Sequence, residues 1–222
     1  MKYNKIEVNQ MNYSVIVLCA GSGSRVGLGY NKMLYRYENQ TVYEHTMSIF
    51  LQDSRCKQIV VVSKEDEREI FQTLLCDSRI TYCNGGKERQ DSVYEGLQLV
   101  NQDYVLIHDG ARPFLQIHSI DELLQSLDKH KACLLMVPCK DTIKEVVDGK
   151  IVKTLKREVL MQAQTPQAFQ SDLIKQVYKI AKEKDFHATD DSQLVEQFSN
   201  EDVYCVIGDY NNIKITTKED LL

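Results

Sequence analysis

The sequence predicts an α/β protein built around a mostly parallel β-sheet. Along residues 1–140, apolar runs rich in Val, Ile and Leu alternate with segments whose apolar residues recur at helical spacing. The apolar runs do not alternate with polar residues, which is typical of strands whose two faces are both covered. We therefore expect parallel strands joined by helices that cover the sheet.

The expected elements of this region follow from the same patterns. The strands are expected over residues 15–19, 58–63, 79–83, 104–108 and 133–137. Two helices are expected to begin at capping boxes, Thr41-x-x-Glu44 and Ser119-x-x-Glu122, because a hydroxyl and a carboxylate at this spacing satisfy the first backbone N–H groups of a helix.

The pattern changes after Pro138. Residues 142–147 and 150–154 flank Asp148-Gly149, a pair that favours a two-residue hairpin turn. We expect this hairpin to project from the domain as an arm over residues 139–160. A helix is expected over residues 171–184, and further strands over residues 203–207 and 213–216.

Composition limits the class of protein. The 222 residues suit one domain, residues 1–222, that includes the arm. With 43% hydrophobic and 27% charged residues, the chain is not disordered, collagen-like or a coiled coil. The net charge of −5 argues against bulk nucleic acid or an anionic membrane as a partner. No apolar run approaches the roughly 20 residues that span a bilayer.

The first residues also bear on location. Residues 1–10 lack the apolar stretch of a signal peptide, so we expect a cytoplasmic protein whose natural start is either Met1 or Met11. The seven Cys residues include no C-x-x-C pair, which favours reduced thiols that fill core positions over disulfides or a zinc site. The five His residues show no metal-ligand spacing and are expected to have structural or surface roles.

Three polar loops follow three of the expected strands. The first, residues 21–27, is rich in glycine and is followed by Lys32; the others span residues 85–92 and 108–113. The first loop matches neither G-x-G-x-x-G, since Val26 stands at the third glycine, nor the P-loop pattern. What remains is a glycine turn that carries Arg25 and is followed, seven residues later, by Lys32. Both side chains could neutralise charge on a polyphosphate. A tight turn with solvated cations is the alternative.

These loops are expected to meet at one edge of the sheet. Parallel strands place their carboxyl ends at the same edge, where open α/β folds bind ligands. Asp109, at the end of a buried strand, is then a candidate ligand for Mg²⁺ beside substrate phosphates, the alternative being an Asp that caps a turn.

Seven motifs together resemble one family over residues 14–222. They are Ala20-Gly21-x-Gly23-x-Arg25-x-Gly27 with Asn31-Lys32, Gly85-Gly86-x-Glu88-Arg89-x-x-Ser92-Val93, His108-Asp109-Gly110-Ala111-Arg112-Pro113-Phe114, Lys140-Asp141-Thr142-Ile143-Lys144, Gln164-Thr165-Pro166-Gln167-Ala168-Phe169, Thr189-Asp190-Asp191 and Asn212-Ile213-Lys214-Ile215-Thr216-Thr217. In these motifs the sequence resembles the 2-C-methyl-D-erythritol 4-phosphate cytidylyltransferases.

The resemblance implies a Rossmann-like three-layer nucleotidyltransferase fold with a projecting β-arm. It also implies an enzyme that uses CTP and Mg²⁺ to convert methylerythritol phosphate into 4-diphosphocytidyl-2-C-methyl-D-erythritol and pyrophosphate, in the non-mevalonate route to isoprenoids. Members work as homodimers in which the arm of one subunit reaches the partner's site.

The resemblance also assigns roles to individual residues. Arg25 and Lys32 match groups that stabilise the transition state, and Arg157 and Lys214 match groups that position the attacking phosphate. The remaining matches are to substrate-binding positions. The positions that bind the nucleotide are Ala20, Gly21, Gly23, Gly86 and Ser92. The positions that line the polyol phosphate pocket are Arg112, Thr142, Thr165 and Thr189. Asp109 matches the position that contacts the metal and the ribose. Whether a second carboxylate such as Asp209 assists the metal stays open.

Three other functions fit the sequence less well. A ribitol 5-phosphate cytidylyltransferase would share fold and mechanism, but Ala111 before Arg112 and Asn31 before Lys32 favour methylerythritol phosphate over ribitol phosphate. A non-catalytic nucleotide-binding module would be expected to lack at least one of the four cations, and all four are present. A Rossmann oxidoreductase is disfavoured by the glycine spacing and by Ser63-Lys64, where an acid would end the second strand.

Overall fold

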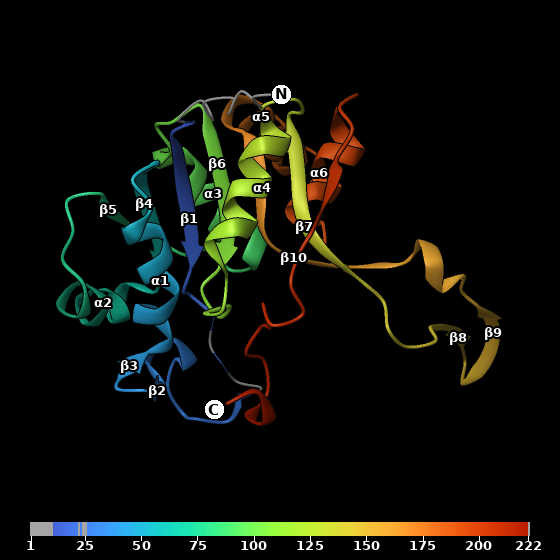
Figure 1. Ribbon diagram of the computed structural model, residues 1–222, viewed down its shortest axis with the longest axis horizontal. Coiled ribbons are helices and arrows are strands. Elements are labelled where there is room, and N and C mark those ends of the chain that lie inside the picture. Colours follow the sequence, from blue (N-terminus) through green and yellow to red (C-terminus); the bar gives the residue numbers. More distant parts are fainter. Residues whose placement is uncertain (1–10, 22, 24–25, 222) are drawn as a thin grey trace, which may run out of the picture.

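A seven-stranded sheet forms the centre of the protein in the computed structural model, which describes residues 11–21, 23 and 26–221. Its strand order is β11-β7-β10-β6-β1-β4-β5 (Figure 1). The strands are β1 (Tyr13–Leu18), β4 (Cys56–Ser63), β5 (Ile80–Asn84), β6 (Tyr104–Asp109), β7 (Ala132–Pro138), β10 (Met161–Gln170) and β11 (Tyr204–Ile207). The α/β class and the mostly parallel sheet are therefore confirmed, since only β10 runs antiparallel to its neighbours, β6 and β7.

Two strand predictions need correction. Strand β10 was not expected from the sequence, because its residues are largely polar and include Pro166. It takes its place in the sheet by pairing with β6 on one side and β7 on the other. The strand predicted over residues 213–216 is wrong: this segment crosses the end of the sheet, where the backbone N–H of Ile215 donates to the carbonyl of Ala111 at 2.8 Å.

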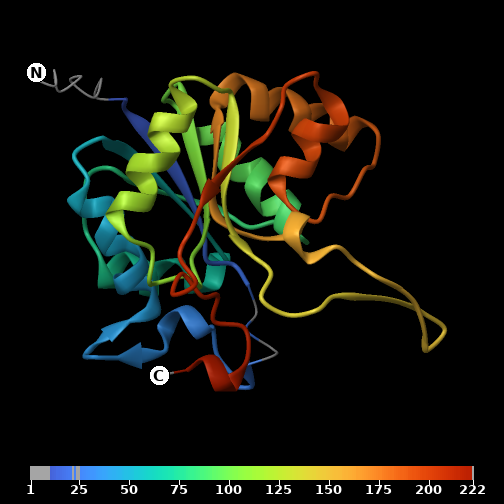
Figure 2. The same ribbon diagram turned by 45° about the vertical axis from the view of Figure 1, so that its right-hand side comes forward.

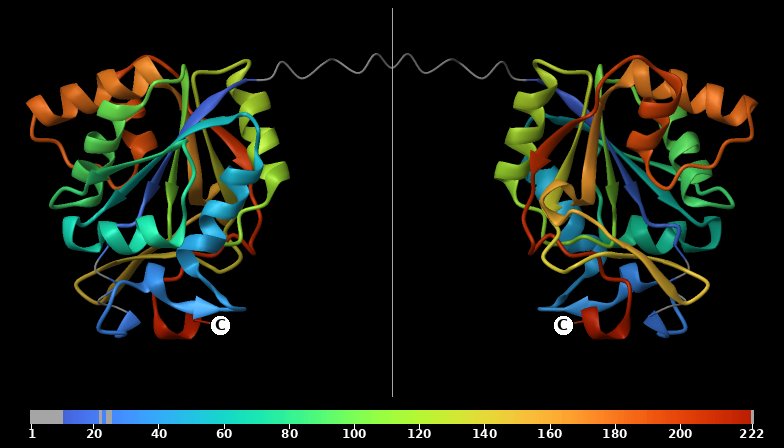
Figure 3. Two further views of the ribbon diagram at one scale, coloured as in Figure 1. Left: turned by 90° about the vertical axis from the view of Figure 1, so that its left-hand side faces the viewer. Right: turned by 90° about the vertical axis from the view of Figure 1, so that its right-hand side faces the viewer.

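Helices cover both faces of the sheet, which gives the three layers that the resemblance implies (Figure 3). One face carries α1 (Val42–Gln52), α2 (Arg68–Leu74) and α4 (Ile117–Leu127); the other carries α3 (Arg89–Leu99), α5 (Ser171–Glu183) and α6 (Asp191–Phe198). Short 3-10 turns are η2 (Lys32–Leu34), η3 (Glu65–Glu67), η4 (Arg157–Val159) and η5 (Lys218–Asp220), and a small ribbon joins β2 (Arg36–Tyr37) to β3 (Gln40–Thr41).

The helix starts test the two predicted capping boxes. The box at Thr41 is confirmed: its hydroxyl accepts from the N–H of Glu44 at 3.1 Å, and the Glu44 carboxylate accepts from the N–H of Thr41 at 2.7 Å. The box at Ser119 is wrong. Helix α4 begins at Ile117, two residues before Ser119, and the extended residue before it is Gln116. The N–H of Ser119 already donates to the Gln116 carbonyl inside the first turn.

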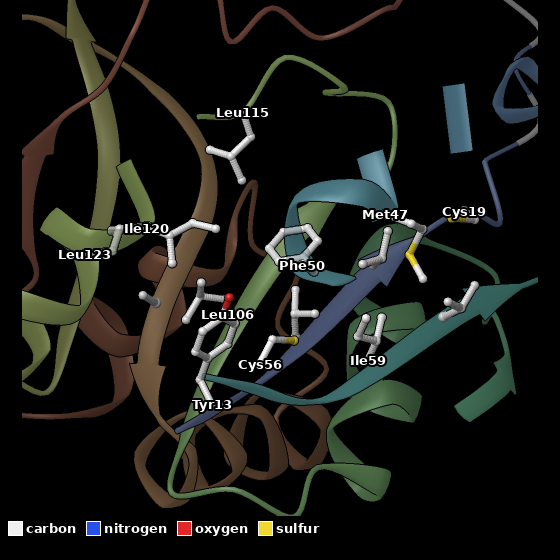
Figure 4. Close-up of a cluster of buried hydrophobic side chains, with 14 of the residues drawn as sticks. Tyr13, Cys19, Met47, Phe50, Cys56, Ile59, Leu106, Leu115, Ile120 and Leu123 are labelled. Carbon is white, nitrogen blue, oxygen red and sulfur yellow. The ribbon is translucent and has the colours of Figure 1, made fainter. Parts of the chain in front are cut away.

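The core is divided between the two faces of the sheet. Figure 4 shows the cluster under α1 and α4, where Phe50 and Met47 pack over the sheet beside Leu106. Of the cysteines, Cys19, Cys56 and Cys133 fill the core as expected, and burial raises the pKa of the Cys56 and Cys133 thiols to about 12. The expectation is wrong for Cys76 and Cys205, which are exposed.

A buried polar cluster at the start of the sheet yields a stability prediction. Asp53 accepts from the Tyr13 hydroxyl at 2.9 Å and from Arg55 Nε at 2.9 Å. Burial alone would raise the pKa of Asp53, but the hydrogen bonds from Arg55 and Tyr13 hold it below its ordinary value.

Asp53→Asn is therefore expected to lower the free energy of unfolding at pH 7 by about 2 kcal/mol. The contribution of Asp53 is complete above the unfolded pKa, near 4, and is lost as the pH falls through the lower folded pKa. Urea unfolding from pH 7 down to pH 3 should show the gap between wild type and variant narrowing in acid. A gap that widens in acid would contradict this.

The predicted hairpin forms the arm. Strands β8 (Lys144–Val147) and β9 (Lys150–Thr154) pair antiparallel, and Asp148 and Gly149 between them both have positive φ, 50° and 75°. The arm, residues 139–160, projects away from the sheet (Figures 1 and 2). At its base the N–H of Cys139 donates to the carbonyl of Leu160 at 3.0 Å. In the part of the chain that the structure describes, no helix is long and apolar enough to cross a membrane.

Candidate functional site

A cavity of about 590 Å³ lies at the carboxyl ends of the parallel strands. It is lined by the loop after β1, the loop after β5, the end of β6 and a segment near the carboxyl terminus of the chain. The sheet order places β4 and β5 on one side of β1 and β6 on the other, so β1 is the point where the chain reverses its direction across the sheet. Open α/β sheets bind their ligands at such a point.

Eight of the predicted site residues line this cavity together. They are Ala20, Gly21, Gly23, Lys32, Gly86, Ser92, Asp109 and Lys214. They come from segments nearly 200 residues apart in the sequence. The fold therefore brings residues of several separate motifs into one cavity. Arg25, the other predicted transition-state cation, lies outside the described residues.

Asn31 joins the end of β1 to the 3-10 turn that begins at Lys32. Its side-chain amide donates to the Cys19 carbonyl at 2.8 Å and to the Glu67 carboxylate at 2.7 Å, and its Oδ1 accepts from the N–H of Met33 at 3.0 Å. The Lys32 ammonium of this turn donates to the Ile215 carbonyl at 2.6 Å, which joins the turn to the segment that carries Lys214.

The loop after β5 closes tightly on the start of α3. The hydroxyl of Ser92 accepts from the N–H of Gly86 at 3.1 Å and donates to the Glu88 carbonyl at 3.0 Å. The N–H of Glu88 donates to the Asp91 carboxylate at 3.0 Å. These bonds tie the loop, which lines the cavity, to the first turn of α3.

Asp109 is surrounded by cations. Its carboxylate lies 2.7 Å from Lys214 Nζ, 3.2 Å from Arg89 Nε and 3.9 Å from Arg112 Nε. Burial alone would raise the pKa of Asp109, but the positive charges of Arg89 and Lys214 outweigh it and hold the pKa far below its ordinary value. Asp109 is therefore ionised throughout the physiological range.

A second layer of hydrogen bonds fixes the end of β6. The hydroxyl of Thr165 accepts from the N–H of Asp109 at 3.0 Å and lies 3.1 Å from His108 Nδ1. Burial lowers the pKa of His108 to about 4, so the ring is neutral at pH 7. Thr165 is itself buried, and Asn212 Nδ2 donates to its carbonyl at 2.9 Å. Thr165 thus lies beneath Asp109, away from the cavity lining.

Besides Thr165, four predicted residues do not line this cavity in their own chain. Arg112 donates to the Asn212 carbonyl at 2.6 Å and is mostly buried. Thr142 and Arg157 are exposed on the arm, where Arg157 donates to the Lys140 carbonyl at 2.9 Å. Thr189 is exposed before α6, beside a separate hollow of about 370 Å³ near β7 and β11.

Three lining cations were missed by the sequence analysis. Lys64, Lys87 and Arg89 line the cavity, and Arg89 belonged to a quoted motif without receiving a role. Their local signal is their place in a segment that follows a strand, Lys64 after β4 and Lys87 and Arg89 after β5. With Lys32 and Lys214 they make the cavity strongly positive, although the whole chain carries a net charge of −5.

The donor set of the cavity suits a hard cation only in part. Among the described residues, no group of three or more His, Cys, Asp and Glu side chains is placed to hold a metal ion. Asp109 and Glu88 are the acidic side chains of the described lining. One ionised carboxylate suits Mg²⁺ where substrate phosphates and water supply the other oxygens.

Comparisons with known proteins agree with this geometry. A family profile described as 2-C-methyl-D-erythritol 4-phosphate cytidylyltransferase matches residues 13–222. Proteins of that name from Bacillus pumilus and Geobacillus kaustophilus are each 42% identical over 217 residues, covering 96% of this chain and 95% of theirs.

Solved structures that resemble this chain carry names of the same enzyme family. The 4-diphosphocytidyl-2C-methyl-D-erythritol synthase of Anaerococcus prevotii superimposes with a TM-score of 0.86 at 34% identity, covering 96% of this chain and 94% of that one. The 2-C-methyl-D-erythritol 4-phosphate cytidylyltransferase of Francisella tularensis gives 0.81 at 29% identity, covering 95% and 96%. The chain belongs to the 2-C-methyl-D-erythritol 4-phosphate cytidylyltransferase family.

Proposed function

We propose that this protein transfers CMP from CTP to 2-C-methyl-D-erythritol 4-phosphate and releases pyrophosphate. One observation carries the proposal: a cavity at the carboxyl edge of the sheet whose lining cations surround an ionised Asp109. A nucleoside triphosphate and a sugar phosphate together bring several negative charges to one place. A positive cavity in an acidic protein fits that substrate pair.

The reaction requires that the acceptor phosphate be held in line with the α-phosphate of CTP and that the negative charge on the phosphates be neutralised. A phosphate oxygen of the acceptor bonds to the α-phosphorus of CTP while the bond from that phosphorus to the bridging oxygen breaks, and pyrophosphate leaves. The acceptor phosphate is already anionic at pH 7, so no general base is needed. Lys32, with Arg25 as the family resemblance suggests, would stabilise the charge on the α-phosphate, and Lys214 would hold the attacking phosphate.

We further propose Mg²⁺ as the cofactor. Asp109 fits it, because it is an ionised carboxylate at the end of β6 and faces the cavity. When bound there, Mg²⁺ would neutralise charge on the triphosphate. The cations of Lys214 and Arg89 lie against the same carboxylate and balance its charge.

The substrate assay is the direct test. Purified protein with CTP and Mg²⁺ is offered methylerythritol phosphate or ribitol 5-phosphate, and pyrophosphate release is followed, with Lys32→Ala as the inactive control. Release with methylerythritol phosphate alone supports the proposal. Release with ribitol phosphate alone would assign the protein to the other acceptor, and no release with either would refute catalysis. We also propose a cytoplasmic location, where both substrates would be found.

The arm supports a homodimer in which each subunit completes its partner's site. Its apolar side chains lie open to solvent, with Val146, Ile151 and Val159 exposed by 55%, 66% and 69%. Exposed apolar side chains gathered on one projecting hairpin are typical of a surface that another chain covers. Thr142 and Arg157 lie on this arm and do not line the cavity of their own chain.

Complementation between two inactive variants tests the arm. Lys32→Ala and Arg157→Ala chains, carrying different tags, are co-expressed, and the mixed dimer is purified by both tags. If the arm acts across the dimer, one of the two sites is intact, so the mixed dimer should have about half the wild-type activity. If the arm served its own subunit, both sites would be defective, and a mixed dimer without activity would refute arm exchange.

A further inference from the structure

Arg89 connects two acidic residues from distant parts of the chain. It occupies the first position of α3, its Nε lies 3.2 Å from Asp109 at the end of β6, and its two terminal nitrogens lie 3.0 and 2.8 Å from the Asp191 oxygens at the start of α6. The planar guanidinium can make these contacts at once because its donors form a rigid fork.

Asp191 is a fixed anchor. Its side chain is fully buried, and its oxygens accept from both terminal nitrogens of Arg89 and from the Tyr178 hydroxyl of α5. Tyr178 is itself buried, and burial raises the pKa of its hydroxyl, so the tyrosine keeps the proton that it donates. Arg89 is therefore held at one end, which leaves its Nε directed at Asp109.

The next residue fastens the same helical turn to the same neighbour. Gln90 Nε2 donates to the Phe186 carbonyl at 2.8 Å, and its Oε1 accepts from the N–H of Ala188 at 2.8 Å. The first turn of α3 is thus joined to the connection between α5 and α6 through two consecutive side chains. The loop of residues 85–88 ends at this turn, so its position depends on the same contacts.

We propose that Arg89 is a positioning residue for the nucleotide: anchored by Asp191, it holds the Asp109 carboxylate and the loop of residues 85–88 in their binding arrangement. Asp191, which does not line the cavity, then controls nucleotide affinity from a distance. This inference rests on the proposed function, because it takes the cavity to be the CTP site. The contacts with Asp109 and with the loop both come from the start of α3, since Arg89 lies 3.2 Å from Asp109 and Ser92 accepts from the N–H of Gly86 at 3.1 Å.

The test measures CTP binding by calorimetry without acceptor, together with steady-state constants and thermal unfolding. Arg89→Lys keeps the charge but loses the fork, and Asp191→Asn weakens the anchor without touching the cavity. Each is expected to weaken CTP binding about tenfold, as loss of an outer partner does at comparable sites. KM for methylerythritol phosphate should change less than twofold.

Arg79→Lys is the matched control. Arg79 also forms a forked pair with an aspartate, at 2.9 and 3.0 Å from Asp77, but at the opposite edge of the sheet. It should lower the unfolding temperature while CTP affinity stays at the wild-type value. A merely structural role for Arg89 would make its variant behave in the same way.

The outcomes separate this inference from the proposed function. Suppose that the wild-type protein binds CTP and releases pyrophosphate, and that Asp191→Asn retains wild-type CTP affinity. The positioning role is then refuted while the proposed function stands. The same holds if Arg89→Lys retains that affinity. If wild type neither binds CTP nor releases pyrophosphate, the proposed function itself fails. Should Arg89→Lys not fold, Asp191→Asn and Tyr178→Phe decide the matter by their CTP affinities alone.

Discussion

Replacing Lys214 with Ala is expected to lower kcat/KM by about a thousandfold, because it removes a cation from the reacting phosphates. Lys214 lines the cavity, and its Nζ lies 2.7 Å from Asp109. Asp109 keeps Arg89 as a partner in the variant, so the protein should remain folded. Pyrophosphate release under steady-state conditions measures the effect, and thermal unfolding confirms the fold.

Lys218→Ala is the control for this variant. Lys218 lies four residues further along the same segment, in η5, and its side chain is exposed. It removes the same charge from the same part of the chain and should change kcat/KM less than twofold. Equal losses in the two variants would mean that only the overall charge of the segment matters, and the role of Lys214 would be refuted.

Gly86→Ala is expected to cause the other large loss, through the loop rather than through charge. A Cβ at residue 86 would lie 2.2 Å from the Cβ of Asp91 and 3.0 Å from its carbonyl carbon. These atoms belong to the first turn of α3, so they cannot move aside without the helix. We expect the loop to separate from α3 and to lose the hydrogen bond from Gly86 to Ser92.

The expected cost is about 2 kcal/mol of stability, typical of overpacking, and a fall in Tm of roughly 6 °C. CTP affinity should fall about a hundredfold, because both the backbone of the loop and its contact with Ser92 are displaced. Calorimetry and thermal unfolding test the two effects. Gly21→Ala is the matched control for folding, since a Cβ there would meet no atom within 4 Å. A Gly86→Ala protein with wild-type Tm would contradict the packing argument.

The predictable part of the fold is the part whose signals are local. Strands β1, β4 and β6 each contain a continuous apolar run because helices cover both faces of the sheet, so their sequences alone identified them. Strand β10 is polar and is held by its neighbours, and the segment of residues 213–216 has a strand-like sequence but crosses the sheet's end. In both cases the tertiary setting decided the structure.

The site divides in the same way. Lys32, Gly86 and Asp109 could be brought together from the sequence because each belongs to the end of a parallel strand or to the segment that follows one, and such segments share one edge of the sheet. The role of Arg89 was not predictable, because its anchor Asp191 lies 102 residues away and no local pattern links them. Thr142 and Arg157 were identified through the family resemblance alone, and a single chain does not bring them to the cavity.

The link between Lys32 and the carbonyl of Ile215 has a consequence for how the site tolerates change. All seven strands of the sheet lie before residue 208 in the sequence, whereas Lys214 and the carbonyl that accepts from Lys32 follow them. The same segment is fastened to the end of the sheet, where the N–H of Ile215 donates to the carbonyl of Ala111 at 2.8 Å. One short stretch of chain therefore carries one lining cation and restrains another, so a substitution that loosens it would disturb Lys32 and Lys214 together.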